Sequence, residues 1–248
     1  MRLFKLFWIL PFLFSFVMLH QKKKIKIFLA GDSTMSVKRL GAYPETGWGM
    51  PFVHFWDSTV TVVNLAQNGR STQTFITEGW WKKIMDDAQP GDYVFIQFGH
   101  NDESVEKKDR YTTPEQYMAN LEKFIKETRD KKAIPVLITP VSRRKFTNGE
   151  AQATHATYTP LVLKVAALQK VPVINLDLKS RQLYQSFGEE TSKLLFLQLK
   201  PGEHPNYPEG KNDNTHFNEL GARLIAQLVL ADIKTLLPAL ADRIVKLK

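Results

Sequence analysis

The sequence contains no cysteine among its 248 residues. This absence excludes disulfide bonds, thiolate metal sites and a cysteine nucleophile. The sequence also lacks a glycine-rich phosphate loop and the H-E-x-x-H pair of zinc proteases, so neither class is supported. Covalent chemistry in this chain therefore depends on oxygen or nitrogen nucleophiles, and we expect no metal ion and no cofactor.

Acidic residues are fewer than basic ones, 25 against 34, which gives a net charge of +9 and a pI near 9.5. Such a surface attracts anionic partners, among them nucleic acid, a membrane surface or an acidic polysaccharide. The basic residues are interspersed with Asp and Glu, and no zinc-finger or RNA-binding signature is present. We therefore expect no nucleic acid as a partner.

The N-terminal segment has the pattern of a targeting sequence. A basic start precedes the apolar run Leu6–Leu19, whose length suits a signal-peptide core and is short for a membrane span. No small-x-small cleavage site is evident before Gln21, so an uncleaved membrane anchor remains the alternative. We expect residues 1–20 to form a leader or anchor, residues 21–248 to form one folded domain, and the protein to be exported to the periplasm or the extracellular space.

Short apolar runs alternate with helix-like segments after this leader. The runs are nearly continuous in apolar residues, as in strands covered on both faces, and the alternation predicts an α/β fold with a five-stranded parallel sheet. The expected strands are Lys24–Ala30, Val60–Ala66, Asp92–Phe98, Ala133–Thr139 and Val171–Leu176.

Two helices are clear from their spacing. One begins with Thr113 as N-cap, Pro114 in the first turn and Gln116 completing a capping box. Its apolar residues repeat at helical spacing, as do those of a second helix near the C-terminus; they are Tyr117, Leu121, Phe124 and Ile125 in the first, and Leu220, Leu224, Ile225 and Leu228 in the second. The proline-rich stretch Pro201–Pro208 is expected to be a surface loop.

Polar motifs follow the first three expected strands. They are GDSTM at Gly31–Met35, AQNGRS at Ala66–Ser71 and GHND at Gly99–Asp102. In an open parallel sheet the ligand lies beyond the carboxyl ends of the strands, so these loops should meet in one crevice. Each motif alone is also typical of an ordinary turn, and it is the combination that indicates a site.

Nucleophilic acyl transfer needs a hydroxyl, a base, a group that orients the base and donors for the oxyanion. Ser33 directly follows the first expected strand, where a turn into a helix would expose its hydroxyl. Asp213 and His216 lie three residues apart in DNTHF, so a tight turn would set the carboxylate against one ring nitrogen while the other faces Ser33.

With these blocks the sequence resembles the SGNH (GDSL-like) hydrolases, and among them the rhamnogalacturonan acetylesterase-like family. The resemblance extends roughly from Ile25 to Lys234 and includes PNYPEGKNDNTHF. It implies a three-layer α/β/α sandwich of flavodoxin-like type and a catalytic triad of Ser33, Asp213 and His216. It also implies an oxyanion hole made by the N–H groups of Ser33 and Gly69 and the Asn101 side chain. The G-x-S-x-G elbow of α/β-hydrolases is absent, because Met35 replaces the second glycine.

The resemblance implies a metal-independent carbohydrate O-acetylesterase that acts on an acetylated, acidic pectic polysaccharide such as rhamnogalacturonan. The alternatives are an SGNH lipase or thioesterase acting on longer acyl chains, and a non-catalytic carbohydrate-binding protein. Basic and aromatic side chains near the expected crevice are candidates for substrate binding; they are Arg70, His100, Arg143, Arg144 and Tyr207. Any contact with a membrane is expected only through the N-terminal segment.

Overall fold

The computed structural model describes residues 22–245. The expected leader therefore lies outside the described residues, and its role remains a prediction. Within residues 22–245, no helix is long and apolar enough to cross a membrane.

A parallel five-stranded sheet forms the centre of the fold, with strand order β2-β1-β3-β4-β7. Its strands are β1 Ile25–Gly31, β2 Val60–Asn64, β3 Tyr93–Gln97, β4 Ile134–Ile138 and β7 Val173–Ile174. All five strand predictions are confirmed, although β7 is shorter than its apolar run. Because all five strands run in one direction, the loops after β1, β2 and β3 leave the sheet at the same edge.

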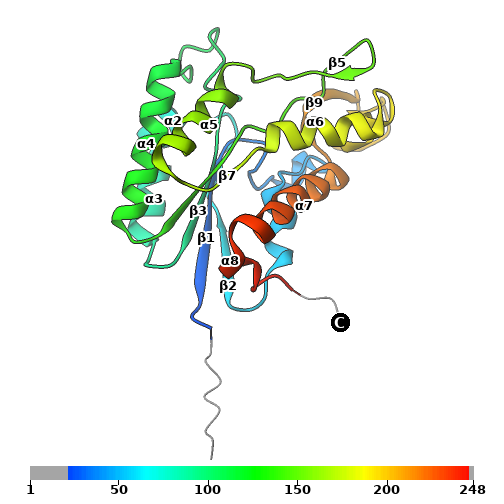
Figure 1. Cartoon of the computed structure of the whole chain (residues 1–248). Coiled ribbons are helices and arrows are strands. Elements are labelled where there is room, and N and C mark those ends of the chain that lie inside the picture. The colour runs from blue at the N-terminus through cyan, green and yellow to red at the C-terminus, as the bar shows by residue number, and fades with distance from the viewer. Residues whose placement is uncertain (1–21, 246–248) are drawn as a thin grey trace, which may run out of the picture.

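Helices cover both faces of the sheet, with α2 to α5 on one side and α6 to α8 on the other (Figure 1). The helices are α1 Gly49–Phe52, α2 Thr72–Thr77, α3 Trp80–Asp87, α4 Pro114–Asp130, α5 Tyr158–Gln169, α6 Leu176–Phe187, α7 Glu219–Leu236 and α8 Pro238–Ala241, with 3₁₀ turns at Leu40–Ala42, Val53–Phe55 and Thr191–Leu195. The predicted three-layer α/β/α sandwich is confirmed.

Two separate cores lie on the two faces of the sheet, as the alternation of side chains along a strand requires. On β1, Ile27 and Leu29 pack into the core that includes α7, whereas Phe28 and Ala30 pack into the core that includes α4. This explains why the strand is apolar along its whole length.

The two predicted helices form, each with one departure. The Thr113 side chain caps α4 by accepting a hydrogen bond from the Gln116 N–H (3.2 Å), but the Gln116 side chain donates to Asn120 instead of completing a capping box. On α7 the residues of the buried face include Ala222 and Ile225, while Leu220 is 47% exposed. The apolar spacing located both helices correctly but placed Leu220 on the wrong face.

Two hairpins outside the main sheet were not predicted. One pairs β5 Phe146–Thr147 with β6 Glu150–Ala151, and the other pairs β8 Phe196–Leu199 with β9 Lys211–Phe217. The stretch Pro201–Pro208 connects β8 to β9 and is mostly exposed, as expected for a surface loop. The second hairpin is irregular: Phe196 pairs with Phe217 and Gln198 with Asn212, so β9 carries a bulge between its two paired ends.

Gly221, in the first turn of α7, allows this helix to pack closely behind the β8–β9 hairpin. A Cβ at this position would lie 1.9 Å from the backbone oxygen of Leu195. We therefore expect Gly221→Ala to destabilise the protein by about 1 to 3 kcal/mol, although alanine ordinarily favours a helix over glycine. Chemical denaturation measures this loss. The control is Gly41→Ala, where no atom lies within 4 Å of the added methyl group; equal stability of the two variants would contradict the close packing.

Candidate active site

Ser33 lies in a tight turn directly after β1. The Asp32 backbone oxygen accepts hydrogen bonds from the N–H groups of Met35 and Ser36, and the buried Asp32 carboxylate accepts two more from Thr34. The turn does not continue into a helix, so that part of the prediction is wrong. Asp32, and not a helix, therefore fixes the conformation of the turn by accepting hydrogen bonds from Thr34, Met35 and Ser36. This conformation leaves the Ser33 side chain partly exposed.

His216 and Asp213 lie on the bulged part of β9. The His216 Nε2 is 2.8 Å from the Ser33 Oγ, and its Nδ1 is 2.8 Å from the Asp213 Oδ2. The other carboxylate oxygen, Oδ1, accepts hydrogen bonds from the N–H groups of Thr215 and His216. The tight turn expected here is thus a turn-like bulge within a strand, and the structure brings the three predicted triad side chains together.

The protonation states of this chain of groups follow from its hydrogen bonds. Burial alone would raise the pKa of Asp213, but the hydrogen bonds and charge of His216 and the backbone N–H donors outweigh burial and lower this pKa to about 2. Asp213 is therefore a carboxylate at neutral pH, and as an acceptor it requires the proton on the Nδ1 of the His216 ring. The Nε2 lone pair then faces the Ser33 hydroxyl, as a general base requires.

The expected oxyanion donors lie in the loops after β1, β2 and β3. Within residues 22–245 neither the Ser33 N–H nor the Gly69 N–H donates a hydrogen bond, so both are available to a ligand. Gly69 adopts a φ of +76°, which few other residues adopt without strain. The Asn101 Nδ2 donates one hydrogen bond to the Arg70 backbone oxygen (3.0 Å), and an amide nitrogen has a second proton to give.

Lys38 was not predicted as part of the site. Its ammonium group is 2% exposed and contacts the backbone oxygen of Ser33 (2.6 Å), the side-chain oxygen of Asn68 (2.8 Å) and the carboxylate of Glu45 (2.7 Å). Burial lowers the pKa of Lys38, while the Glu45 carboxylate opposes that shift. The ammonium therefore connects the turn that carries Ser33 to Asn68, the residue that precedes Gly69.

His100 has a different position from the one expected of a substrate-binding group. Its ring is 5% exposed, its Nδ1 lies 3.2 Å from the Asp32 carboxylate, and its face lies 4.3 Å from the His155 ring. Burial lowers the pKa of His100 to about 4, so the ring is neutral at pH 7. His100 supports the turn that holds Ser33 from behind, and its burial disfavours the predicted contact with substrate.

The predicted basic residues are largely engaged with the protein itself. Arg144 is 9% exposed and donates to Ser192, Asn214 and the Glu189 backbone oxygen, which disfavours the predicted contact with substrate. Arg143 forms an ion pair with Glu103 (2.6 Å). Arg70 forms an ion pair with Glu78 (2.8 Å).

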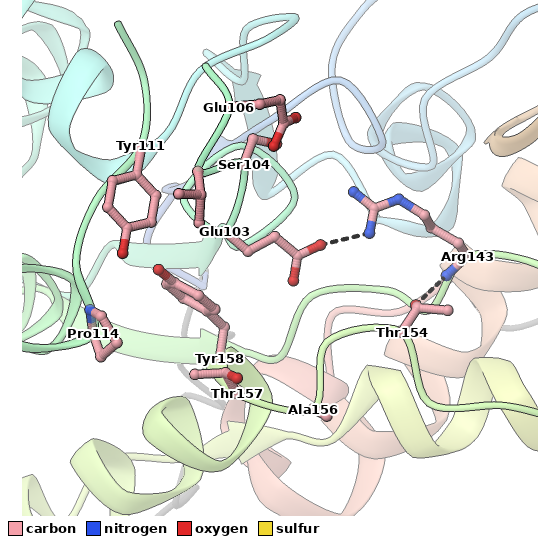
Figure 2. Close-up of a pocket in the computed structure, with 11 residues that line it drawn as sticks. Glu103, Ser104, Glu106, Tyr111, Pro114, Arg143, Thr154, Ala156, Thr157 and Tyr158 are labelled. Atoms are coloured by element: carbon pink, nitrogen blue, oxygen red, sulfur yellow. Dashed lines mark hydrogen bonds and ion pairs between the residues drawn. The ribbon is translucent and has the colours of Figure 1, made fainter. Parts of the chain in front are cut away.

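Arg143 and its ion pair line a hollow of about 580 Å³ beside the loop after β3. Figure 2 shows the carboxylate of Glu103 pointing at Arg143, with the rings of Tyr111 and Tyr158 on the opposite wall. Tyr207, the remaining predicted substrate residue, is half-buried and donates its hydroxyl to the Ala42 backbone oxygen (2.8 Å). Arg143 and Tyr207 each keep some exposed surface, and their contact with substrate remains a prediction.

The contacts of Lys38 generate a kinetic prediction. Lys38→Met keeps most of the length of the side chain but removes the charge. The Ser33 turn and the Gly69 loop then lose their charged common partner and are joined only by the weaker contacts of the Ser36 hydroxyl. We expect kcat on p-nitrophenyl acetate to fall by about 10- to 100-fold with little change in KM, because a small misplacement of reacting groups is costly. Glu45→Gln, which leaves the ammonium in place, should have a smaller effect. A folded Lys38→Met protein with wild-type kcat would contradict this role.

Asp102, next to Asn101, generates a prediction for pH dependence. Burial raises the pKa of Asp102 to about 7, although hydrogen bonds from Thr72 favour its charged form. Between pH values of about 4 and 7 the folded protein then holds a proton that the unfolded chain releases, so stability falls as the pH rises, by at most about 1.4 kcal/mol per pH unit.

The variant Asp102→Asn has no proton to lose at this position. We therefore expect the free energy of unfolding to fall less between pH 5 and pH 8 in this variant than in the wild type, as measured by urea denaturation. Asp109→Asn, at a side chain that is 71% exposed, serves as the control and should keep the wild-type slope. Equal slopes for Asp102→Asn and the wild type would contradict the buried, protonated carboxyl.

Comparison with known proteins agrees with this geometry. The family model described as GDSL-like Lipase/Acylhydrolase family matches residues 29–224. The rhamnogalacturonan acetylesterase RhgT of Bacillus subtilis (strain 168) is 42% identical over 225 residues, which cover 90% of this chain and 96% of that protein. The probable rhamnogalacturonan acetylesterase YesY of the same organism is 37% identical over 222 residues, which cover 89% of this chain and 97% of that protein.

Solved structures show the same fold. The protein YxiM from Bacillus subtilis superposes with a TM-score of 0.73 at 26% identity, and the match covers 86% of this chain and 56% of that one. The acetylxylan esterase Axe2 from Geobacillus stearothermophilus, in a catalytic mutant, gives a TM-score of 0.60 at 17% identity over 85% of this chain and 94% of that one, which supports the fold alone. The family model, the relatives and the three loops that meet at Ser33 lead to one conclusion: the chain belongs to the GDSL-like lipase/acylhydrolase family.

Proposed function

We propose that this protein is a carbohydrate O-acetylesterase that removes acetyl groups from a pectic polysaccharide, most specifically rhamnogalacturonan. The observation that carries this proposal is the continuous chain of hydrogen bonds from Ser33 through His216 to Asp213, with both links at 2.8 Å. The substrate is proposed from relatives named as rhamnogalacturonan acetylesterases, which match this chain over about nine tenths of its length.

The proposed reaction begins with attack of the Ser33 Oγ on the acetyl carbonyl carbon, while the His216 Nε2 takes the hydroxyl proton. The resulting imidazolium is stabilised by the Asp213 carboxylate. The tetrahedral intermediate then expels the sugar oxygen, which receives the proton from His216, and leaves an acetyl group on Ser33. Water activated by His216 attacks this ester, so acetate departs and the serine is restored.

The negative charge of the tetrahedral intermediate needs donors that are already in place. The N–H groups of Ser33 and Gly69 and the second Nδ2 proton of Asn101 are the proposed donors. One donor of this kind contributes about 3 to 4 kcal/mol to the stability of the transition state. The nearby Lys38 ammonium adds a positive charge on the side of the Ser33 backbone oxygen.

Export is also part of the proposal. The proposed substrate is a polysaccharide, which an enzyme meets outside the cell. The apolar run Leu6–Leu19 has the length of a signal-peptide core. The net charge of +9 supports an acidic polymer as the partner, because opposite charge raises the encounter rate. Cell fractionation followed by N-terminal sequencing of the mature protein tests export and the fate of residues 1–20 together.

The substrate proposal predicts a ranking of acetate release. Acetylated rhamnogalacturonan should give a higher kcat/KM than acetylated xylan or mannan, and p-nitrophenyl acetate a higher rate than p-nitrophenyl octanoate. Ser33→Ala, which removes only the nucleophile, is the control and should retain its fold while losing turnover on every substrate. A preference for octanoate would favour a lipase or thioesterase, and turnover by Ser33→Ala would exclude the proposed nucleophile.

A further inference from the structure

A second hollow, of about 350 Å³, lies against the loop that carries Gly69. Its lining includes Asn68, Gly69, Arg70, Glu78, Asp109 and Arg110. Its volume is at the lower end of the range for small-ligand pockets, about 300 to 1,000 Å³, and suits one sugar residue. The hollow therefore adjoins a proposed oxyanion donor and contains two guanidinium groups.

The first of these groups is already neutralised. The Nε of Arg70 donates to the Glu78 carboxylate (2.8 Å), and its Nη1 donates to the Asn68 backbone oxygen (2.7 Å). The same carboxylate oxygen of Glu78 also accepts a hydrogen bond from the Trp80 indole (3.0 Å). Arg70 and Glu78 thus satisfy each other and form a neutral wall of the hollow.

Arg110 differs because its guanidinium is poorly satisfied. Within residues 22–245 its buried Nε has no hydrogen-bond partner. The carboxylate of Asp109 lies 3.4 Å from this nitrogen, but it is 71% exposed, and an ion pair so open to water contributes little. The buried Nε itself does not face the hollow, but the Arg110 side chain is 29% exposed, and within the described residues its Nη2 makes no hydrogen bond. The terminal nitrogens of the guanidinium consequently have donors to offer to a ligand.

Arg110 also lies close to two of the proposed oxyanion donors, Gly69 in the loop after β2 and Asn101 in the loop after β3. Its Nη1 lies 3.4 Å from the Asn101 Oδ1 and 3.1 Å from the point where a Cβ on Gly69 would lie. A side chain larger than glycine at position 69 would therefore meet this guanidinium. A group bound to Arg110 therefore lies next to two of the proposed oxyanion donors.

We infer that Arg110 forms a carboxylate-binding subsite that takes a hexuronate residue of the acetylated polymer next to the ester under attack. A guanidinium matches a carboxylate with two parallel hydrogen bonds, and Arg110 has the unsatisfied donors for them. The exposed Asp109 side chain can turn into water as the ligand carboxylate arrives. This inference rests on the proposed function, because it identifies the acidic sugar that the proposed esterase recognises.

Three substrates separate carboxylate recognition from catalysis. They are acetylated rhamnogalacturonan, the same polymer with its carboxylates methyl-esterified, and p-nitrophenyl acetate. We expect Arg110→Gln to lower kcat/KM on the acidic polymer by tenfold or more, mainly through KM, and to change the other two by less than twofold. The control is Lys131→Gln, which removes the same charge from an exposed position at the C-terminal end of α4, at the opposite edge of the sheet.

Two results would overturn the inference. An equal loss on all three substrates would show that Arg110 only holds Asn101 in place, and no loss on the acidic polymer would show that the hollow does not meet the substrate. Failure of the proposed function would look different, because the wild type itself would then release no acetate from the polymer. Calorimetric titration of Ser33→Ala and of Ser33→Ala with Arg110→Gln with unacetylated oligogalacturonate tests the subsite without turnover, and equal affinity for the two proteins would also overturn it.

Discussion

The buried ammonium of Lys38 holds the two loops of the reaction centre at a fixed separation. It contacts the backbone oxygen of Ser33 and the side chain of Asn68, which precedes Gly69, while Glu45 neutralises its charge. Removing a charge from water costs several kcal/mol, and an ion pair with complete hydrogen bonding offsets that cost. An ammonium has three donors, and all three are used here. The Ser36 hydroxyl contacts the same two groups, but only the ammonium is a charged partner. The ammonium cannot move away from the nucleophile turn and the Gly69 loop without leaving a buried charge unpaired.

Behind Ser33 a second set of buried polar contacts resists movement of the same turn. Trp48 donates to the Gln97 side chain at the end of β3, and Gln97 donates to the Thr34 hydroxyl (2.7 Å), which donates to Asp32. Hydrogen bonds in such a low-dielectric chain strengthen one another. His216 approaches from the opposite side on the bulge of β9, and α7 packs behind it. The reacting groups thus come from parts of the chain that are far apart in sequence, each held by its own buried partners.

The sheet and the triad residues could be predicted because their signals are local. Five apolar runs predicted the five strands. A polar motif at the end of the first strand predicted Ser33, and the spacing within DNTHF predicted Asp213 and His216; the structure brings these three residues together. The bulge of β9 could not be predicted, since it depends on pairing with β8 and not on the residues of DNTHF alone. The same limit applies to Lys38 and Arg110, because nothing in their sequence context shows that they are partly or fully buried beside loops distant in the chain. The burial of Arg144 could not be predicted either. Two adjacent arginines suggest an exposed, charged surface, and only the fold shows that the Arg144 side chain is buried.

The net charge of the whole protein and the charge available at the site are different quantities, because two of the predicted arginines form ion pairs within the protein. A net charge of +9 acts over about 8 Å at physiological ionic strength and raises the encounter rate with any polyanion. It does not choose a sugar, because Arg70 and Arg143 are matched by Glu78 and Glu103 at ion-pair distance. Selectivity requires a donor that lacks a partner until the ligand arrives, since only such a group gains hydrogen bonds on binding. The Arg110 guanidinium beside Gly69 meets that requirement, because it is partly exposed and, within the described residues, its Nη2 has no hydrogen-bond partner. The Asn101 amide is held by its shorter hydrogen bond to the Arg70 backbone oxygen (3.0 Å), whereas Arg110 lies 3.4 Å from the Asn101 Oδ1. The acidic sugar therefore binds beside the oxyanion donor without being needed to position it, so recognition of the sugar and stabilisation of the transition state depend on neighbouring but different side chains.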